Sequence, residues 1–324
     1  MLVAGGMEWL LAPQYWMARL VFHRLLGVAY LVAFISAFNQ FAALAGERGL
    51  LPCRPYLRTV GSRRAPSLFH LHYSDRFGRA TAALGIALSV GVVAGVVERL
   101  PLAAAMGVWL TLWVLYLSFV NAGQTFFGFV WETLLLEAGF LAVFLGSADV
   151  APLVPAVLAL RWLLFRLEVG AGLIKLRNDP AWRDLTALYY HYETQPIPNR
   201  LSRWLHHLPK PVHRLEVIGN HVAQVVAPFA LFLPQPVASV AGVVVVLSQL
   251  WLMASGNFAW LNVLTIALAA LASTTGSSAT SCRYARRHSP RHRGGSPPPS
   301  SSWRWRCWRS AGARCETWRL GTRS

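Results

Sequence analysis

Charged side chains are scarce in this sequence: they make up 13% of its 324 residues, whereas 55% are hydrophobic. Soluble domains carry about 25% charged residues, so an ordinary soluble domain is excluded. Long apolar runs fill the deficit, which indicates an integral membrane protein. No apolar–polar alternation recurs at β-barrel spacing. The predicted fold class is therefore all-α, a polytopic bundle of transmembrane helices in a lipid bilayer.

Cysteine and the common catalytic motifs are also missing. Of four cysteines, only Cys53 lies before the C-terminal tail, and no CxxC pair supports a zinc ribbon or a redox motif. No glycine loop suited to a phosphate and no Gly-x-Ser-x-Gly elbow occurs, which argues against a lipase activity of its own. No cofactor is predicted. No metal is predicted either, because the histidines lack metal-motif spacing: His191, His206, His207, His213 and His221.

The apolar runs predict about seven to eight helices within a membrane domain, residues 1–272. The segment 1–19 is aromatic and expected at the interface, and no cleavable signal is recognised before the first span. The predicted spans are 25–44, 80–97, 102–120, 126–145, 153–174, 217–233, 237–255 and 258–272. The last is shorter than the roughly 17–25 residues that a crossing needs, so we expect it not to cross unaided.

Two basic loops, 48–79 and 176–214, lie on the same side of the predicted bundle. The connections on the other side carry almost no Arg or Lys. The positive-inside rule then places both basic loops in the cytoplasm.

The tail, residues 273–324, differs from the rest in composition. Its Arg side chains are scattered among Ser, Pro, Gly and Trp, with no Lys and no apolar periodicity. One interpretation is a disordered basic arm on anionic lipid headgroups. The favoured interpretation is a GC-rich reading frame translated out of register, which would also shorten the last apolar run. No specific nucleic-acid binding is predicted from such a tail.

Ionisable residues inside the apolar runs each need a partner, because an unpaired charge in a membrane is costly. Glu132 and Glu137 are five residues apart and point to different sides of one helix, so a paired-carboxylate site is not expected. Each should instead pair with an Arg or a backbone donor of a neighbouring helix. The next run also carries Arg166.

Arg161, Glu168 and Lys175 follow each other at intervals of seven residues and share one helix stripe. Ala171 and Gly172 on that stripe would allow another helix to approach closely. The favoured interpretation is an ion-pair ladder inside the bundle. The alternative is a partly desolvated Lys175 that acts as a base or nucleophile.

The loop 179–200 is aromatic and punctuated by proline, unlike a flexible linker. Its prolines restrict the backbone and exclude long helices, so binding through this loop would lose little entropy. We therefore predict a contact surface for a client protein or a lipid headgroup. The candidate contact residues are Trp182, Tyr189, His191, Tyr192, Glu193, Gln195, Pro196 and Pro198.

Several motifs in order give the chain a family likeness. They are Ala-Pro-Gln-Tyr-Trp at 12–16, Gly-Glu-Arg-Gly-Leu-Leu-Pro at 46–52, Trp-Glu-Thr-Leu-Leu-Leu-Glu-Ala-Gly-Phe at 131–140, His-Tyr-Glu-Thr-Gln-Pro at 191–196 and Gly-Asn-Phe at 256–258. Over about residues 7–272 the chain resembles the lipase maturation factor family in its shorter bacterial form. Animal members of this family lie in the endoplasmic reticulum membrane and help dimeric lipases to reach an active fold.

The resemblance implies a non-enzymatic integral membrane factor, in a bacterial plasma membrane, that assists the folding, maturation or assembly of exported proteins such as lipases. The segment 170–175 is also similar to a lysine-bearing segment of vitamin K-dependent carboxylases. That likeness implies a membrane enzyme that uses Lys175 as its base, with Glu168 or His191. A lipid or small-molecule transporter, with a path lined by Glu132, Glu137 and Arg161, is a further alternative.

Overall fold

The computed structural model describes residues 10–195 and 197–274, and the elements in this part of the chain are helices. The predictions for the first nine residues, for Pro196 and for nearly all of the tail fall outside the described residues. A single isolated bridge, between Leu11 and Leu153, is the extended pairing that the described part contains. The all-α prediction is therefore confirmed.

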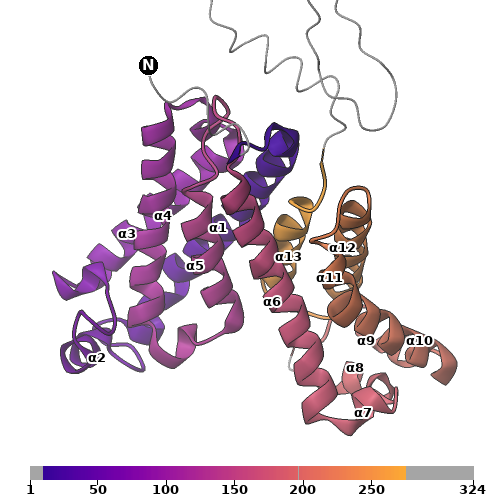
Figure 1. The fold of residues 1–324 in the computed structure, drawn as a ribbon. Coiled ribbons are helices and arrows are strands. Elements are labelled where there is room, and N and C mark those ends of the chain that lie inside the picture. The colour runs from indigo at the N-terminus through magenta and orange to yellow at the C-terminus, as the bar shows by residue number, and fades with distance from the viewer. Residues whose placement is uncertain (1–9, 196, 275–324) are drawn as a thin grey trace, which may run out of the picture.

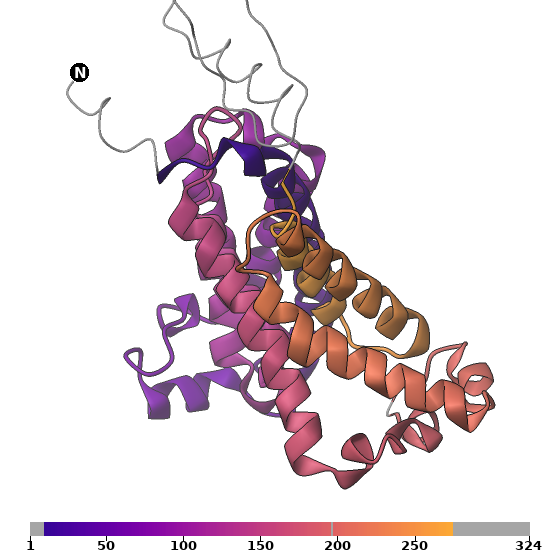
Figure 2. The same cartoon turned by 45° about the vertical axis from the view of Figure 1, so that its right-hand side comes forward.

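The main helices form two groups, with α6 and α13 between them (Figures 1 and 2). The first group is α1 (Trp16–Ala45), α3 (Asp75–Ala94), α4 (Leu102–Ala122) and α5 (Val130–Ala142). The second group is α10 (Lys210–His221), α11 (Ala227–Ala230) and α12 (Val237–Ser255). The two helices between them are α6 (Val154–Asn178) and α13 (Leu261–Ala270), and the short helices are α2 (Cys53–Val60), α7 (Pro180–Arg183), α8 (His191–Thr194) and α9 (Ser202–His206).

Four described helical segments are long and apolar enough to cross a membrane: Pro13–Ala45, α3, α4 and α12. The chain is thus an integral membrane protein by length and composition, but the predicted count of seven to eight spans is too high. The run 126–145 contains only the 13 residues of α5, about 20 Å of helix, because a 3-10 turn at Gln124–Phe127 and Gly128 precede it.

Three other predicted spans are not among these four helices, each for a different reason. α6 is long enough but carries Arg161, Arg166, Glu168, Lys175 and Arg177. The run 217–233 is not one uniform helix, because a π-helical turn at Val222–Val226 interrupts it. α13 has ten residues, in agreement with the expectation that this run is too short to cross unaided.

The first group packs around buried aromatic rings. Tyr30 and Phe34 of α1 meet Tyr116 and Phe119 of α4 edge to face, with ring centroids 5.3–6.3 Å apart. Phe41 adds a further edge contact to Phe119 at 4.9 Å. Edge-to-face contacts place the positive ring edge on the negative ring face, so they orient the helices as well as fill the space between them.

Two glycines allow this close packing. A Cβ atom at Gly85 of α3 would lie 2.5 Å from the Phe34 ring, and one at Gly139 of α5 would overlap the Tyr30 hydroxyl. Both glycines face α1, so two buried rings of that helix, Phe34 and Tyr30, occupy the space that a side chain would need. The first group is therefore filled by matched shapes, with large rings set against small residues.

Three arginines close the C-terminal ends of neighbouring helices. Arg19 and Arg24 project from α1, and Arg161 from α6. Their guanidinium groups donate to the carbonyl oxygens of Leu145 and Val150, of Val92 and Val93, and of Leu231, Leu271 and Ala272, respectively. The last carbonyls of a helix lack intrahelical partners and carry partial negative charge. The buried Arg19 and Arg161 and the partly exposed Arg24 therefore satisfy carbonyls at or just after the ends of α3, α5, α11 and α13.

Candidate functional site

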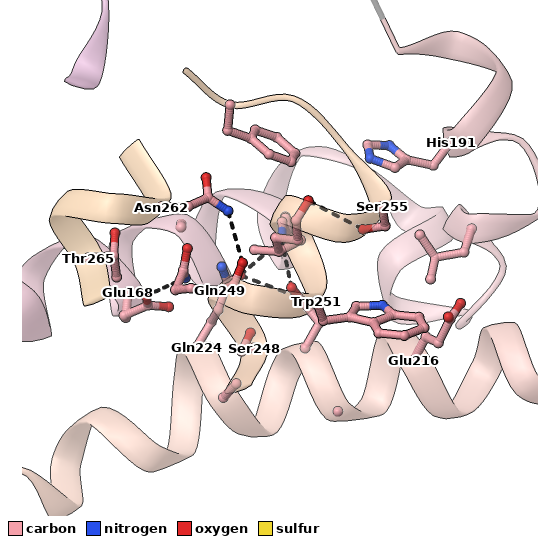
Figure 3. Close-up of a pocket in the computed structure, with 18 of the residues that line it drawn as sticks. Glu168, His191, Glu216, Gln224, Ser248, Gln249, Trp251, Ser255, Asn262 and Thr265 are labelled. Carbon is pink, nitrogen blue, oxygen red and sulfur yellow. Dashed lines mark hydrogen bonds between the residues drawn. The ribbon is translucent and has the colours of Figure 1, made fainter. Parts of the chain in front are cut away.

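A cavity of about 570 Å³ lies in the second half of the molecule. Helices α6, α10, α12 and α13 form its walls, and the 179–200 loop covers it (Figure 3). It brings together the three residues that sequence singled out as catalytic candidates, Glu168, Lys175 and His191. A volume of this size is ordinary for a small-molecule pocket.

A chain of buried amides surrounds Glu168. Gln249 of α12 donates from Nε2 to Glu168 Oε1 at 2.9 Å, and Asn262 of α13 donates to the Gln249 carbonyl at 3.2 Å. In Figure 3, Glu168, Gln224 and Gln249 lie toward one end of the cavity, with His191 and Glu216 toward the other. Helices α6, α12 and α13 are therefore joined by polar contacts inside an apolar bundle.

Lys175 is held by three contacts near the end of α6. Its Nζ donates to Asn220 Oδ1 at 2.9 Å and to Gln224 Oε1 at 3.0 Å. It also lies 4.6 Å from the centre of the Trp182 ring, a cation–π contact. Lys175 thus connects α6 to α10, to the π-helical turn Val222–Val226 and to the loop.

The predicted ion-pair ladder is wrong. No ion pair between Arg161, Glu168 and Lys175 occurs in the part of the chain that the structure describes. A step of seven residues raises the chain by about 10 Å along a helix, which is too far for direct contact. Each of the three therefore bonds to a different neighbouring element, and Arg161 adds the Tyr15 hydroxyl at 2.9 Å to its carbonyl acceptors.

The π-helical turn Val222–Val226 shapes one wall of the cavity. Pro228 has no N–H to donate to the Gln224 carbonyl four residues earlier, and Ala227 instead bonds the Val222 carbonyl five residues back. The wider turn presents the Gln224 side chain to Lys175. Opposite it, a Cβ at Gly172 would lie 2.5 Å from Val225 Cγ2, so the small residue on α6 permits the close approach that sequence predicts.

The loop folds back on α10 instead of extending away from the bundle. Asp179 caps α7 by accepting from the Ala181 N–H at 2.9 Å. The loop is made of short helical turns, as its prolines predict. Leu188 and Tyr192 are buried against Val217 of α10, which fixes the loop on the helix.

Four predicted contact residues turn inward and line the cavity: Trp182, His191, Tyr192 and Gln195. Trp182 packs edge-on against His191 at 6.0 Å, and the His221 Nε2 atom lies 3.0 Å from the Trp182 carbonyl oxygen. Tyr192 donates to Glu216 Oε2 at 3.4 Å. These side chains therefore close the cavity more than they face an outside partner.

Of the other candidates, Tyr189, Glu193 and Pro198 lie on the outer side of the loop, and Pro196 falls outside the described residues. Tyr189 accepts a hydrogen bond from Arg214 at 2.9 Å, and Glu193 pairs with His206 at 3.0 Å. Pro198 is exposed. The outer side is thus partly occupied by polar contacts to α9 and α10.

Burial and charge set the protonation of two loop residues. Burial lowers the pKa of His191, and the nearby Lys175 ammonium lowers it further, so its ring is neutral at pH 7. Burial raises the pKa of Tyr192, and the Glu216 carboxylate adds to this effect. Tyr192 therefore keeps its proton and can donate to Glu216.

The remaining predicted intramembrane charges lie outside the cavity. Glu132 accepts a hydrogen bond from the Tyr116 hydroxyl of α4, and Glu137 pairs with Arg166 of α6. Glu137 pairs with an arginine of a neighbouring helix, as the sequence predicts, whereas the partner of Glu132 is a tyrosine hydroxyl and not the predicted Arg or backbone donor. None of Glu132, Glu137 and Arg161 lines the cavity, so the path drawn for a transporter does not form there.

Sequence reasoning missed most of the polar lining. Asn220, Gln224, Gln249 and Asn262 are uncharged amides, and Glu216 follows the loop on α10. A search restricted to ionisable groups in apolar runs overlooks amides. A usable signal was present, since Gln249 and Asn262 each interrupt an otherwise apolar helix. Within residues 10–195 and 197–274, no group of three or more His, Cys, Asp or Glu side chains is arranged to hold a metal ion.

The fold and the site define a class: an integral membrane helical protein with a loop-covered polar cavity in one half. Residues 17–278 match the lipase maturation factor transmembrane domain. The chain belongs to the lipase maturation factor family. No solved structure matches it.

The curated relatives carry the same family name. The chain is 41% identical to lipase maturation factor 1 of Bos taurus over 277 residues, 79% of this chain and 48% of that protein. It is 38% identical to lipase maturation factor 1 of Homo sapiens over 286 residues, 81% and 49% of the two chains. For human lipase maturation factor 2, identity is 34% over 284 residues, 77% and 39% of the two chains.

The chain spans about half the length, or less, of these relatives. The family and the relatives give no support to the carboxylase-like enzyme or to the transporter.

Proposed function

We propose that this chain is a membrane factor that assists the maturation of exported lipases, and that it acts through the 179–200 loop and the helices beside it. The observation that carries the proposal is the match of residues 17–278 to the family's transmembrane domain, which includes the whole loop. A plasma membrane of bacterial type is the proposed location. α5, α6, α13 and the run from α10 to α11 would complete the bundle around the four long apolar spans.

The outer side of the loop offers the contact surface for a client. Tyr190, Ile197, Leu201 and Trp204 are large apolar residues exposed on or just after the loop, and Trp204 is 76% exposed. Exposed aromatic and aliphatic side chains gathered on a fixed backbone are typical of interaction sites. The inward residues Trp182 and Tyr192 would support this surface from below.

The test is the activity of a secreted reporter lipase in cells that lack the endogenous factor and carry this chain or a variant. Trp204→Ser and Ile197→Ser together should lower secreted lipase activity several-fold at unchanged membrane abundance, because the client loses its apolar contact. Trp182→Ala should lower it as well, by loosening the support of the loop.

The matched control is Leu71→Ser. Leu71 is an apolar residue that is 86% exposed in the other basic loop, far along the chain from the 179–200 segment. Equal losses for Leu71→Ser and for the loop pair would argue against a specific contact. Unchanged lipase activity in all variants, and in cells without the chain, would remove the maturation function.

A further inference from the structure

Three residues that line the cavity each carry a buried oxygen atom without a hydrogen-bond partner. Glu168 Oε2, Glu216 Oε1 and Gln195 Oε1 are shielded from solvent and accept no hydrogen bond within residues 10–195 and 197–274. Glu168 is only 2% exposed. A buried acceptor left unpaired destabilises a fold by about 1–3 kcal/mol in mutational series, so three around one cavity call for an explanation.

Lys175, the lysine on the described lining, already has hydrogen-bond acceptors within the protein, so it does not call for an anionic ligand. Lys175 has two amide acceptors and the Trp182 ring around its ammonium group. It therefore has no free N–H directed at an anion. The lining also holds two carboxyl groups, Glu168 and Glu216, against one ammonium. The unpaired oxygens of Glu168, Glu216 and Gln195 are all acceptors, so the partners that they lack are hydrogen-bond donors.

The mouth of the cavity opens on an apolar surface. Val212 of α10 and Trp251 of α12 both line the cavity and are exposed. Large exposed apolar residues lie near them on the same helices, Leu215 and Ile218 on α10 and Leu247 and Leu250 on α12, although Lys210 and Arg214 of α10 are exposed as well. Since α12 is long and apolar enough to span the membrane, lipid chains can reach this mouth.

We propose that the cavity binds a single-chain lipid whose headgroup carries several O–H or N–H donors. The headgroup would lie inside, where it donates to Glu168, Glu216 and Gln195, and the acyl chain would leave through the mouth beside Val212 and Trp251. Neutral hydroxyls and an ammonium group share this chemistry. A phosphate or a carboxylate headgroup does not, because it would place further acceptors and negative charge beside the unpaired oxygens of Glu168, Glu216 and Gln195.

The experiment uses the full chain purified in detergent, one brominated reporter lipid and four competitors that share one hydrocarbon chain length. A dibrominated monoacylglycerol quenches tryptophan on contact, and 1-monooleoylglycerol, oleylamine, oleate and methyl oleate compete with it. Trp182→Phe and Trp251→Phe should each reduce the quenching, since both indoles line the cavity. 1-Monooleoylglycerol or oleylamine should compete at least about tenfold better than oleate and methyl oleate, the effect of one hydrogen bond to a charged group. The glycerol probe and the amine probe distinguish the two donor headgroups.

Substitution of the acceptors completes the test. Glu168→Ala should weaken binding of the better probe about tenfold, and Gln195→Ala, at the covering loop, should weaken it by a smaller factor. Glu137→Ala is the control, because Glu137 pairs with Arg166 away from the cavity. Thermal unfolding of each variant shows whether a loss of binding comes from loss of the fold.

Three results would overturn the proposal. Oleate as the best competitor would make Lys175 an anion anchor. Equal competition by all four probes would mean unspecific partition into the bundle. If the brominated lipid quenches no tryptophan fluorescence, the cavity binds no lipid. Because binding is read without any lipase, its failure would leave the maturation function standing, and failure of the lipase assay would leave this site standing.

Discussion

The two halves of the molecule solve the same packing problem in different ways. In α1, α3, α4 and α5, rings fill the space that glycines leave, as Tyr30 does opposite Gly139. Around α6, α10, α12 and α13, a cavity of about 570 Å³ remains, and several of its polar atoms have no partner. A fold normally satisfies its buried polar groups. Unpartnered atoms occur in both halves, as at His23 Nε2 of α1, but only in the second half do three of them belong to residues around one cavity.

One pair of residues makes the difference concrete. Glu132 and Glu168 are both buried glutamates in helices of the bundle. In the filled half, Glu132 accepts from Tyr116. At the cavity, Glu168 accepts from Gln249 through Oε1, and its Oε2 accepts no hydrogen bond within the described residues. The same residue type is therefore structural in one half and available in the other.

The largest effect should come from a side chain added to the filled half. Gly139→Leu would force a side chain into the Tyr30 ring, and we expect a loss of about 3 kcal/mol or more, because a close-packed core cannot expand. Size-exclusion chromatography and thermal unfolding in detergent measure it. Gly107→Leu is the control, since a Cβ there meets no atom within 4 Å. If both variants fold equally well, the filled half is less rigid than described.

Removal of the arginine between the halves should have the next largest effect. Arg161→Met removes the side-chain donor from the carbonyls of Leu231 and Leu271, whereas that of Ala272 keeps Gln235, and we expect a loss of about 3 kcal/mol. Arg166→Met removes only a half-exposed pair with Glu137, worth about 1 kcal/mol at most. The unfolding temperatures of the two variants should therefore differ clearly. Equal shifts would show that Arg161 does not secure the helix ends.

A smaller effect separates the two buried glutamates. Tyr116→Phe removes the donor to Glu132 and should lower stability by about 1–3 kcal/mol. Glu168→Gln keeps an acceptor for Gln249 and removes a carboxylate that lacks a full set of donors, so stability should stay unchanged or rise. Chemical or thermal unfolding of the two variants under one condition decides between these signs. A large loss in Glu168→Gln would make Glu168 structural.

The smallest effect is the response of the loop to acid. Because burial and Lys175 lower the pKa of His191, the unfolded loop binds a proton before the docked loop does as pH falls below about 6.5. Docking should thus be complete above that pH and weaken below it. Hydrogen exchange of residues 179–195 at stepped pH measures this. Lys175→Met removes one of the two causes of the lowered pKa, so the loop should lose less hydrogen-exchange protection at a given acid pH. If neither Lys175→Met nor His191→Phe changes the pH dependence of protection, His191 is not the titrating group.

Sequence predicts the helical class, the helix at 102–120 and the prolines' effect on the loop, because local hydrophobicity and backbone restriction determine these features. It overestimates the number of spans, since apolar runs do not reveal the 3-10 turn before α5 or the π-helical turn after α10. Pro228 is the residue that could have predicted the second of these interruptions.

The candidate site was predictable only in part. Glu168, Lys175 and His191 were identified one by one, from a charge stripe and from an aromatic loop, yet the cavity that joins them depends on long-range packing of α6 against α10 and α12. The shared helix stripe predicts an ion-pair ladder of Arg161, Glu168 and Lys175 only if side chains seven residues apart touch each other. The rise of the helix over seven residues keeps them apart.

We propose that the loop-covered half of the molecule carries the function and that the filled half supports it. The most direct measurement is secreted reporter-lipase activity per unit of membrane-inserted chain for Trp182→Ala and Glu168→Gln, with Tyr116→Phe as the variant of the other half. We predict that activity per inserted chain falls several-fold for the two cavity variants and stays near the unmodified level for Tyr116→Phe. Equal activity per inserted chain in all three, or a loss confined to Tyr116→Phe, would contradict the account.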